Sequence, residues 1–297
     1  MNSRRLAGSA ALLTSAFLWA TGYLAVKQMV EDVAPCLLLA MRFSLSAVIL
    51  LVLFLPKLKK LTRGTLATGI RMGAALFFEF FCYTVGLQYT TVAKTSFIIA
   101  SYIILLPIVY FIIRKKLISR GDILCSILCM AGLGLILADG VGGFNRGDLF
   151  GVFSALFYAV HIVYSAQYAK EYDGGLLNLV QIATAAVLAL AAALISGDFF
   201  VADVTAAFPP FWSVLYLAVV CTILPYVFCL LGMKYVSTMT SGILLSFESV
   251  FATILSVILL NERLYWQLVA GGAIILAAVI LSEVFAVLPA SKRRRQE

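Results

Sequence analysis

Long apolar runs alternate with short polar connections along the whole chain. Each run is about 20 residues long or slightly longer, which is the length an α-helix needs to cross the hydrocarbon core of a bilayer. The pattern predicts ten membrane-spanning helices and hence an all-α polytopic membrane protein. The runs cover residues 6–27, 35–55, 65–88, 91–113, 119–138, 148–170, 176–196, 212–235, 238–260 and 264–286.

Composition agrees with this pattern and excludes a soluble domain. Hydrophobic residues make up 63% of the chain and charged residues 12%, with a mean hydropathy of +1.05. A soluble domain has roughly 45–50% apolar and about 25% charged residues. Five of the six cysteines lie inside apolar runs and no Cys-x-x-Cys occurs. We therefore expect buried thiols, with no disulfide framework, metal site or cofactor.

The basic residues are distributed unevenly between the two sides of the predicted membrane. If the N-terminus lies inside, sixteen Lys and Arg fall on the inner side, and Lys27, Lys94, Arg146 and Arg263 fall on the outer side. This asymmetry follows the positive-inside rule and predicts that both termini are cytoplasmic, in a bacterial-type inner membrane. The net charge of +8 therefore indicates topology and contact with anionic lipid, at residues 292–295 above all, and no nucleic acid partner.

The sequence also contains an internal repeat. Residues 86–96 (GLQYTTVAKTS) resemble residues 232–242 (GMKYVSTMTSG), and residues 15–20 (SAFLWA) resemble residues 154–159 (SALFYA). Two matches in the same order and at similar offsets indicate a duplication, with one repeat over 1–140 and another over 141–297. Five spans per repeat is an odd number, so the second repeat enters the membrane inverted. Inverted repeats are typical of secondary transporters, although channels and membrane enzymes can also be duplicated.

Several motifs resemble landmarks of the EamA-type branch of the drug/metabolite transporter superfamily. They are LWATGYLAVK at 18–27, VAP at 33–35, RF at 42–43, AKTSFIIASY at 93–102 followed by Pro107, LSFESVF at 245–251, NERL at 261–264 and GGAIIL at 271–276. Together they cover nearly the whole chain. The resemblance implies a ten-span fold, a central cavity lined mainly by spans 1, 3, 4, 6, 8 and 9, and transport of small organic solutes.

Three charged residues lie inside predicted spans, away from their ends. Glu79 is near the middle of span 3, Glu248 near the middle of span 9, and Arg42 about two turns into span 2. A charge at the bilayer centre costs about 2.5–3.5 kcal/mol on insertion scales, so each of these residues needs a partner or a function. Either glutamate could carry a coupling proton, or it could act as a structural lock by pairing with Arg42 or by hydrogen bonding to neighbouring helices.

Other candidate residues have alternative interpretations as well. His161 in span 6 could read substrate polarity or be a hydrogen-bonded packing residue. Lys94 could extend to the outer interface or point into the cavity mouth. Pro107 and Pro225 free backbone carbonyls that could bind solute or allow bending. An aromatic wall for a partly apolar ligand, or simply packed core, is predicted from Trp19, Tyr23, Phe97, Tyr102 and Tyr158.

These features favour a solute carrier over an enzyme or receptor. The chain has a single His, no His-Glu-x-x-His motif and no phosphate-binding Gly-x-x-x-x-Gly-Lys-Ser/Thr loop. We expect a secondary transporter, acting as an exporter of amino acids or related metabolites by alternating access and coupled to protons, as a monomer or homodimer. An uncoupled facilitator is the alternative.

Overall fold

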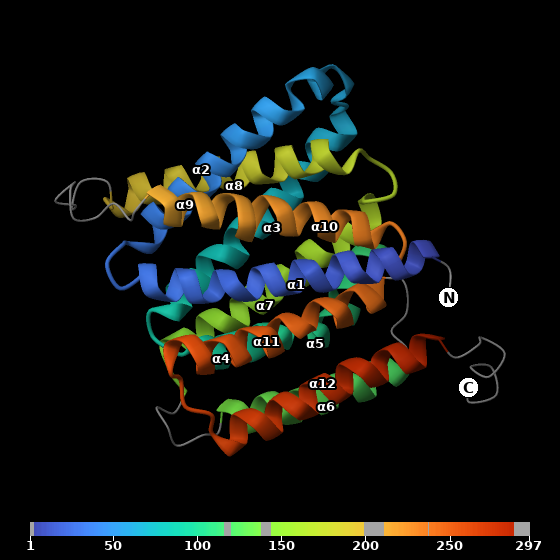
Figure 1. Ribbon diagram of the computed structural model, residues 1–297. Helices are drawn as coiled ribbons and strands as arrows, with labels where there is room; N and C mark the ends of the chain where they lie inside the picture. Colours follow the sequence, from blue (N-terminus) through green and yellow to red (C-terminus); the bar gives the residue numbers. More distant parts are fainter. Residues whose placement is uncertain (1–2, 116–119, 138–143, 199–210, 237, 288–297) are drawn as a thin grey trace.

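The computed structural model describes residues 3–115, 120–137, 144–198, 211–236 and 238–287, and the regular elements in this part of the chain are all helical (Figure 1). The elements are α1 (Ser3–Met29), α2 (Pro35–Phe54), η1 (Leu55–Lys60), α3 (Arg63–Leu87), α4 (Val92–Ala100), α5 (Tyr102–Arg114), α6 (Arg120–Leu137), α7 (Arg146–Tyr168), α8 (Gly174–Ser196), α9 (Phe211–Ala218), η2 (Val219–Ile223), α10 (Leu224–Met233), α11 (Thr238–Leu260) and α12 (Trp266–Val287).

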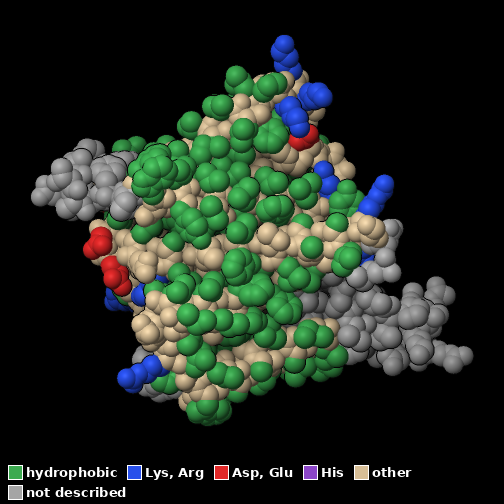
Figure 2. Space-filling view, viewed as in Figure 1, with side chains coloured by type: hydrophobic (Ala, Val, Ile, Leu, Met, Phe, Trp, Pro, Cys, Tyr) green, Lys and Arg blue, Asp and Glu red, His purple; other side chains and the backbone are tan. Residues whose placement is uncertain are grey.

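These helices confirm the prediction of an all-α polytopic membrane protein. Among the described residues, seven helical segments are long and apolar enough to cross a bilayer, and three shorter apolar helices accompany them over Leu124–Leu137, Leu244–Leu260 and Trp266–Ala278. Each of these ten segments overlaps a different predicted apolar run. Figure 2 shows hydrophobic side chains over the middle of one face, with charged side chains gathered at the two ends. A lipid-facing surface requires this distribution.

Two of the spans are interrupted helices. The fourth consists of α4 and α5, which meet at Ser101. The eighth consists of α9, the π-helical turn η2 and α10. In η2, the N–H of Leu224 donates to the carbonyl of Val219, five residues earlier. Pro225 follows and has no N–H, so the Cys221 carbonyl loses its usual helical donor. The break therefore leaves a polar backbone group inside the membrane that another residue must satisfy.

Helices of one repeat pack mainly against helices of the other. Helix α3 packs on α7 and α8, α1 packs on α10 and α11, α7 packs on α4 and α5, α2 packs on α8, and α6 packs on α12. Figure 1 shows this interleaving, with blue α1 lying between the orange segments α10 and α11. Exchanging the two repeats converts these pairs into one another, and the counterpart of the α3–α8 pair is the contact of α2 with α9 and η2. The predicted boundary after residue 140 falls within 138–143, outside the described residues.

Close helix contacts at glycines follow the repeat. In each contact the ideal Cβ position of one glycine lies 2.6–3.1 Å from the carbonyl oxygen of the other, closer than a side chain allows. The repeat offsets exchange the Gly8–Gly232 contact with the Gly86–Gly147 contact, and the Gly132–Gly271 contact joins the final spans of the two repeats. Small residues permit such approach in membrane helices. The pairs are Gly8 with Gly232, Gly86 with Gly147, and Gly132 with Gly271.

The contacts also establish that equivalent helices run in opposite directions. Lys27 at the end of α1 donates through Nζ to the Leu87 carbonyl at the end of α3 (2.7 Å). Gly86, also near the end of α3, touches Gly147 at the start of α7. Helix α7 therefore begins at the end of the molecule where α1 finishes. The repeated left-handed residues Lys115 (φ 54°) and Asn261 (φ 53°), 146 positions apart, belong to the same pattern.

Candidate functional site

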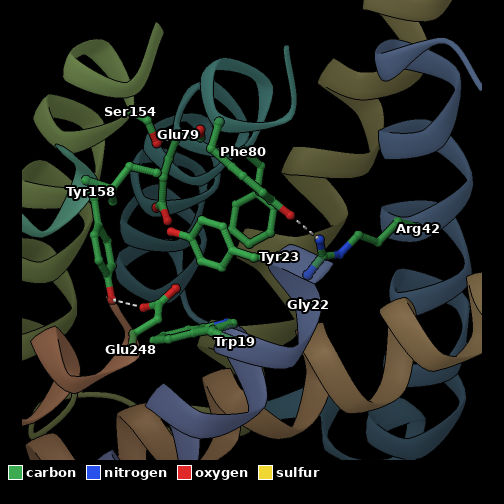
Figure 3. A pocket seen from close by; sticks show the side chains of 11 residues that line it. Trp19, Gly22, Tyr23, Arg42, Glu79, Phe80, Ser154, Tyr158 and Glu248 are labelled. Atoms are coloured by element: carbon green, nitrogen blue, oxygen red, sulfur yellow. Dashed lines mark hydrogen bonds between the residues drawn. The ribbon is translucent and has the colours of Figure 1, made fainter. Parts of the chain in front are cut away.

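A small cavity lies at the centre of the helix bundle, between the two repeats. It is lined from α1, α2, α3, α4, α7 and α11 (Figure 3). The family resemblance implied lining from spans 1, 3, 4, 6, 8 and 9; the structure adds span 2 through Arg42 and places span 8 behind the lining. The lining residues are Trp19, Gly22, Tyr23, Arg42, Glu79, Phe80, Tyr83, Ile99, Ser154, Tyr158 and Glu248.

The cavity is nearly filled by its own side chains. The space open to the centre of a water-sized sphere is about 20 Å³, which is close to what a single water molecule requires. An adjoining space of about 10 Å³ lies beside Tyr102, Ser246 and Ser249. Neither space admits an organic solute. The structure is therefore a closed conformation, and a ligand of that size requires the repeats to separate.

Two carboxyl groups, one from each repeat, enter this cavity. Glu79 comes from α3 and Glu248 from α11, and both point toward the space around Tyr23 (Figure 3). Glu248 accepts a long hydrogen bond from the Tyr158 hydroxyl (3.5 Å). Glu79 Oε2 is buried without a hydrogen-bond partner among the described residues. The Ser154 hydroxyl donates to the Glu79 backbone carbonyl (3.0 Å) and not to its carboxyl group. Both carboxyl groups therefore retain acceptor capacity toward the cavity.

Arg42 reaches the same cavity but makes no ion pair with either glutamate. Its Nε donates to Thr222 Oγ1 (2.6 Å), Nη1 to the Tyr83 hydroxyl (3.1 Å) and Nη2 to the Cys221 carbonyl (2.6 Å). The Cys221 carbonyl is the group that Pro225 deprives of a helical donor. A direct ion pair between a glutamate and Arg42 is therefore absent from this conformation. Arg42 instead donates to the Cys221 carbonyl, which lacks a helical donor where span 8 is interrupted.

The predicted aromatic wall is partly assembled. Trp19, Tyr23 and Tyr158 line the cavity. Tyr102 lines the adjoining space, packs against Tyr158 with ring centroids 4.6 Å apart, and donates to the Gly242 carbonyl. Phe97 lies elsewhere, because its ring fills the position that a side chain on Gly272 of α12 would occupy. Phe97 therefore packs between helices and does not line either space.

His161 is also outside the cavity lining. Its Nε2 lies 2.9 Å from Gln181 Oε1 on α8, and the Gln181 amide in turn donates to Asn178 (2.9 Å). The imidazole ring packs against Tyr226, which packs against Trp19. These contacts correspond to the hydrogen-bonded packing interpretation. Contact with a ligand would have to pass through Tyr226 and Trp19.

Lys94 lies at the end of the molecule where α3 ends and α4, α7 and α12 begin, here called the α3–α4 end. Its Nζ pairs with Asp148 Oδ2 at 2.8 Å, and Asp148 is fully buried. The same oxygen accepts from the backbone N–H of Asn145, which forms a capping box with Asp148 at the start of α7. Lys94 therefore joins the two repeats and does not extend into the cavity or simply to the interface.

A second polar connection joins the repeats at the α3–α4 end. The Glu262 carboxylate, from the NERL motif between α11 and α12, accepts from the backbone N–H groups of Val92 (2.8 Å) and Ala93 (3.1 Å). These are orphan donors of the first turn of α4, where a negative charge is favoured by the helix dipole. Together with the Lys94–Asp148 pair, this cap closes the α3–α4 end over the cavity.

The opposite end, here called the η1 end, carries a weaker connection. Asp173 caps α8 by accepting from the N–H groups of Gly175 and Leu176, and its carboxylate lies 3.7 Å from Lys57 Nζ. Partial burial alone would raise the pKa of Asp173, but the two N–H groups, Lys57 and Lys234 outweigh it and hold this pKa below the ordinary value. Both members of the pair are nearly half exposed, so it contributes little.

Some lining residues were missed by the sequence analysis. Phe80 and Tyr83 follow Glu79 by one and four positions on α3, so a helical face drawn through Glu79 includes Tyr83. That spacing was a usable signal. Ile99 and Ser154 lie in segments quoted as motifs, 93–102 and 154–159, but neither side chain was singled out. In the part of the chain that the structure describes, no cluster of His, Cys, Asp or Glu could hold a metal ion.

An inverted-repeat helical bundle with a closed central cavity is typical of polytopic membrane transporters. The family comparison is consistent with this class: the model of the EamA-like transporter family matches residues 6–138 and again 145–284. The chain belongs to this family. It is 27% identical over 286 residues to an uncharacterized transporter of Archaeoglobus fulgidus, covering 94% of this chain and 86% of the relative. A solved crystal structure matches with a TM-score of 0.69 and 19% identity, covering 98% of each chain, which supports the fold alone.

Proposed function

We propose that this transporter moves small organic solutes, such as amino acids or related metabolites, by alternating access and acts as an exporter. The carrying observation is the closed cavity between interleaved repeats, with a carboxyl group from each repeat and aromatic rings around it. Rocking of inverted repeats about a central site would expose such a cavity to each side of the membrane in turn. Closure at the α3–α4 end would then alternate with closure at the η1 end.

Coupling to protons is the second part of the proposal. Glu79 and Glu248 are titratable groups buried at the cavity, and Glu79 Oε2 has no donor among the described residues. A proton on either group would remove a buried charge while the repeats move, which lowers the penalty of keeping that charge in a low-dielectric region. The alternative is an uncoupled facilitator, in which both glutamates have a structural role only.

Purified protein in vesicles separates the two alternatives. Labelled amino acids and related metabolites are offered with and without a pH gradient, to wild type, Glu79→Gln and Glu248→Gln, with the exposed Glu31→Gln as a matched control. We expect gradient-driven transport in wild type and in the control, and loss of gradient dependence in at least one cavity variant. If both cavity variants are produced normally and keep full gradient-dependent transport, carboxylate coupling is refuted. Transport that never responds to the gradient favours the facilitator.

The orientation completes the proposal. We place both termini in the cytoplasm of a bacterial-type inner membrane, because of the uneven distribution of Lys and Arg. On this basis the η1 end faces the cytoplasm and the α3–α4 end faces outward. Asp203 and Arg295, two positions suited to labelling, lie outside the described residues, whereas Lys59 lies in η1 and is exposed.

A further inference from the structure

The charged groups of the cavity differ in how far the protein already satisfies them. Arg42 donates to three neutral acceptors, and its guanidinium lies 4.5 Å from the centroid of the Phe80 ring, a cation–π arrangement. Glu79 Oε2 has no partner among the described residues, whereas Glu248 has the 3.5 Å contact with the Tyr158 hydroxyl and a further contact with the Tyr23 hydroxyl. The cavity therefore lacks mainly hydrogen-bond donors and positive charge for its carboxyl groups.

The aromatic lining has the same preference. Trp19, Tyr23 and Tyr158 border the space that both carboxyl groups enter (Figure 3). Faces of aromatic rings attract cations, and Trp does so most strongly. Two buried neutral donors near this space, the indole N–H of Trp19 and the hydroxyl of Tyr226, have no partner in the described chain. Neutral donors bring no positive charge to balance two carboxyl groups, so an anionic ligand gains less here than a cationic one.

The charge total of the cavity adds a constraint. A net charge near the bilayer centre is unfavourable, so the states that move across the membrane should be nearly neutral. With Arg42 charged, the empty cavity is neutral when one of the two carboxyl groups carries a proton. With both carboxyl groups ionised, it is neutral when a ligand brings one positive charge. One bound proton and one bound monovalent cation thus give the cavity the same net charge of zero. They exclude each other, because both together would leave a net positive charge.

We infer that the solute of this transporter is a monovalent organic cation, an ammonium or guanidinium compound with an apolar part, exchanged one for one with a proton between Glu79 and Glu248, with Arg42 as the fixed counter-charge. This inference rests on the proposed transport function and narrows its solute class to compounds with a net charge of +1, which excludes zwitterionic amino acids. The proton leaves the cavity to the side from which the cation enters, and the reverse occurs at the other side. Each complete cycle moves one positive charge in each direction and no net charge.

Every ionisable group that faces the two carboxyl groups enters this charge count. The hydroxyl and guanidinium groups come from Tyr23 on α1, Arg42 on α2, Tyr83 on α3, Tyr102 on α5, Tyr158 on α7 and Tyr226 on α10. The thiols are those of Cys82 and Cys229. Tyrosines and thiols are neutral when protonated, with reference pKa values of about 10 and 8.5. Arg42 therefore remains the single fixed positive charge among these groups.

Proton release on binding tests the inference without transport. The probe is 2-phenylethylguanidinium, which stays charged at every pH used and offers N–H donors, so any released proton comes from the protein. Purified protein in weakly buffered detergent is titrated between pH 5 and pH 9. We expect about one proton released per probe bound in the pH range where the cavity holds its proton. Binding without proton release throughout the range would overturn the exchange.

Variants locate the exchange in the cavity. Glu79→Gln and Glu248→Gln should each release no proton and bind the probe about ten- to a hundredfold more weakly, as expected for a lost hydrogen bond to a charged group. Exposed Glu31→Gln should behave as wild type. Unchanged release in both cavity variants would overturn the assignment. If a variant does not fold, the wild-type titration and the transport measurement below still decide.

Transport in vesicles separates this inference from the proposed function. The probe is compared with phenylalanine, a zwitterion, and 3-phenylpropionate, an anion. We expect the probe alone to move, driven by a pH gradient and unaffected by a potassium diffusion potential set with valinomycin. Movement of phenylalanine or the anion without the probe would overturn the cation inference and keep the transporter. Probe movement that follows the potential would overturn the one-for-one exchange. If no compound moves, the proposed function is contradicted, and the binding titration decides on the cation site alone.

Discussion

Replacing Gly132 by alanine tests how the final spans of the two repeats pack. On α6 the ideal Cβ of Gly132 lies 2.7 Å from the Gly271 carbonyl oxygen and 2.9 Å from Ile275 Cγ1 on α12. The first neighbour is backbone and cannot rotate away, so the helices must separate. Two residues further along the same helix, a Cβ at Gly134 has nothing within 4 Å. Gly134→Ala is therefore a matched control.

The expected magnitude follows from comparing the two variants. Both exchange glycine for a better helix former, a gain of up to about 1 kcal/mol that cancels in the comparison. Only Gly132→Ala adds overpacking, which usually lowers the free energy of unfolding by about 1–3 kcal/mol. Gly132→Ala should thus be less stable than Gly134→Ala by that amount, and Gly134→Ala should be neutral or slightly stabilised relative to wild type.

Thermal unfolding of purified protein in one detergent measures the difference. In a protein of this size 1 kcal/mol shifts the unfolding midpoint by about 2–4 °C, so a clear separation of the two variants is expected. The double variant Gly132→Ala with Gly271→Ala should be lower still, since each new methyl group meets the opposing backbone. Equal midpoints for Gly132→Ala and Gly134→Ala would refute the close α6–α12 contact and the reasoning built on it.

Three further predictions concern charged positions. Lys94→Met should lower the free energy of unfolding by about 3–5 kcal/mol, because it removes the ion-pair partner of fully buried Asp148; the reasoning fails if Lys94→Met melts like wild type while Asp148→Asn does not. The pKa of Asp173 is lower in the folded protein than in the unfolded chain, where it is about 4, so wild type should be slightly more stable than Asp173→Asn above that pH. This difference in stability should vanish as the pH falls through the folded pKa. Melting curves from pH 7 to pH 3 measure it, and a higher melting temperature of Asp173→Asn at pH 7 would contradict the reasoning. Lys59→Cys should resist a membrane-impermeant thiol reagent in intact cells and react after lysis, against a background of six buried native cysteines; labelling in intact cells would reverse the proposed orientation.

Sequence alone was sufficient for the fold class and for singling out the three charged residues that line the cavity. A run of about 20 apolar residues has few stable alternatives to a membrane-spanning helix, because every backbone group must be satisfied internally. Glu79 and Glu248 were identifiable for a related reason, since a carboxyl group in the middle of such a run is rare. The echo between residues 86–96 and 232–242 likewise identified the duplication that the family match contains.

The direction in which each side chain points was decided only by the tertiary structure. In a bilayer both the lipid and the neighbouring helices are apolar, so periodicity does not distinguish the lipid-facing side of a helix from its buried side. Phe97 and Tyr102 lie on adjoining helical segments of one span, yet only Tyr102 borders a cavity. His161 turned toward Gln181 on α8, a contact within the second repeat that depends on how α7 and α8 lie in the folded bundle.

Arg42 shows most clearly what the sequence predicts and what only the tertiary structure decides. Its charge inside a span predicted a partner, and a glutamate was the natural candidate in the sequence. The partner is instead the break in span 8, where Pro225 withholds an N–H from the Cys221 carbonyl and Arg42 supplies the replacement donor. A proline can be read from sequence, but the residue that compensates for it is fixed by three-dimensional proximity of segments about 180 residues apart, because hydrogen bonding depends on distance in space and not along the chain.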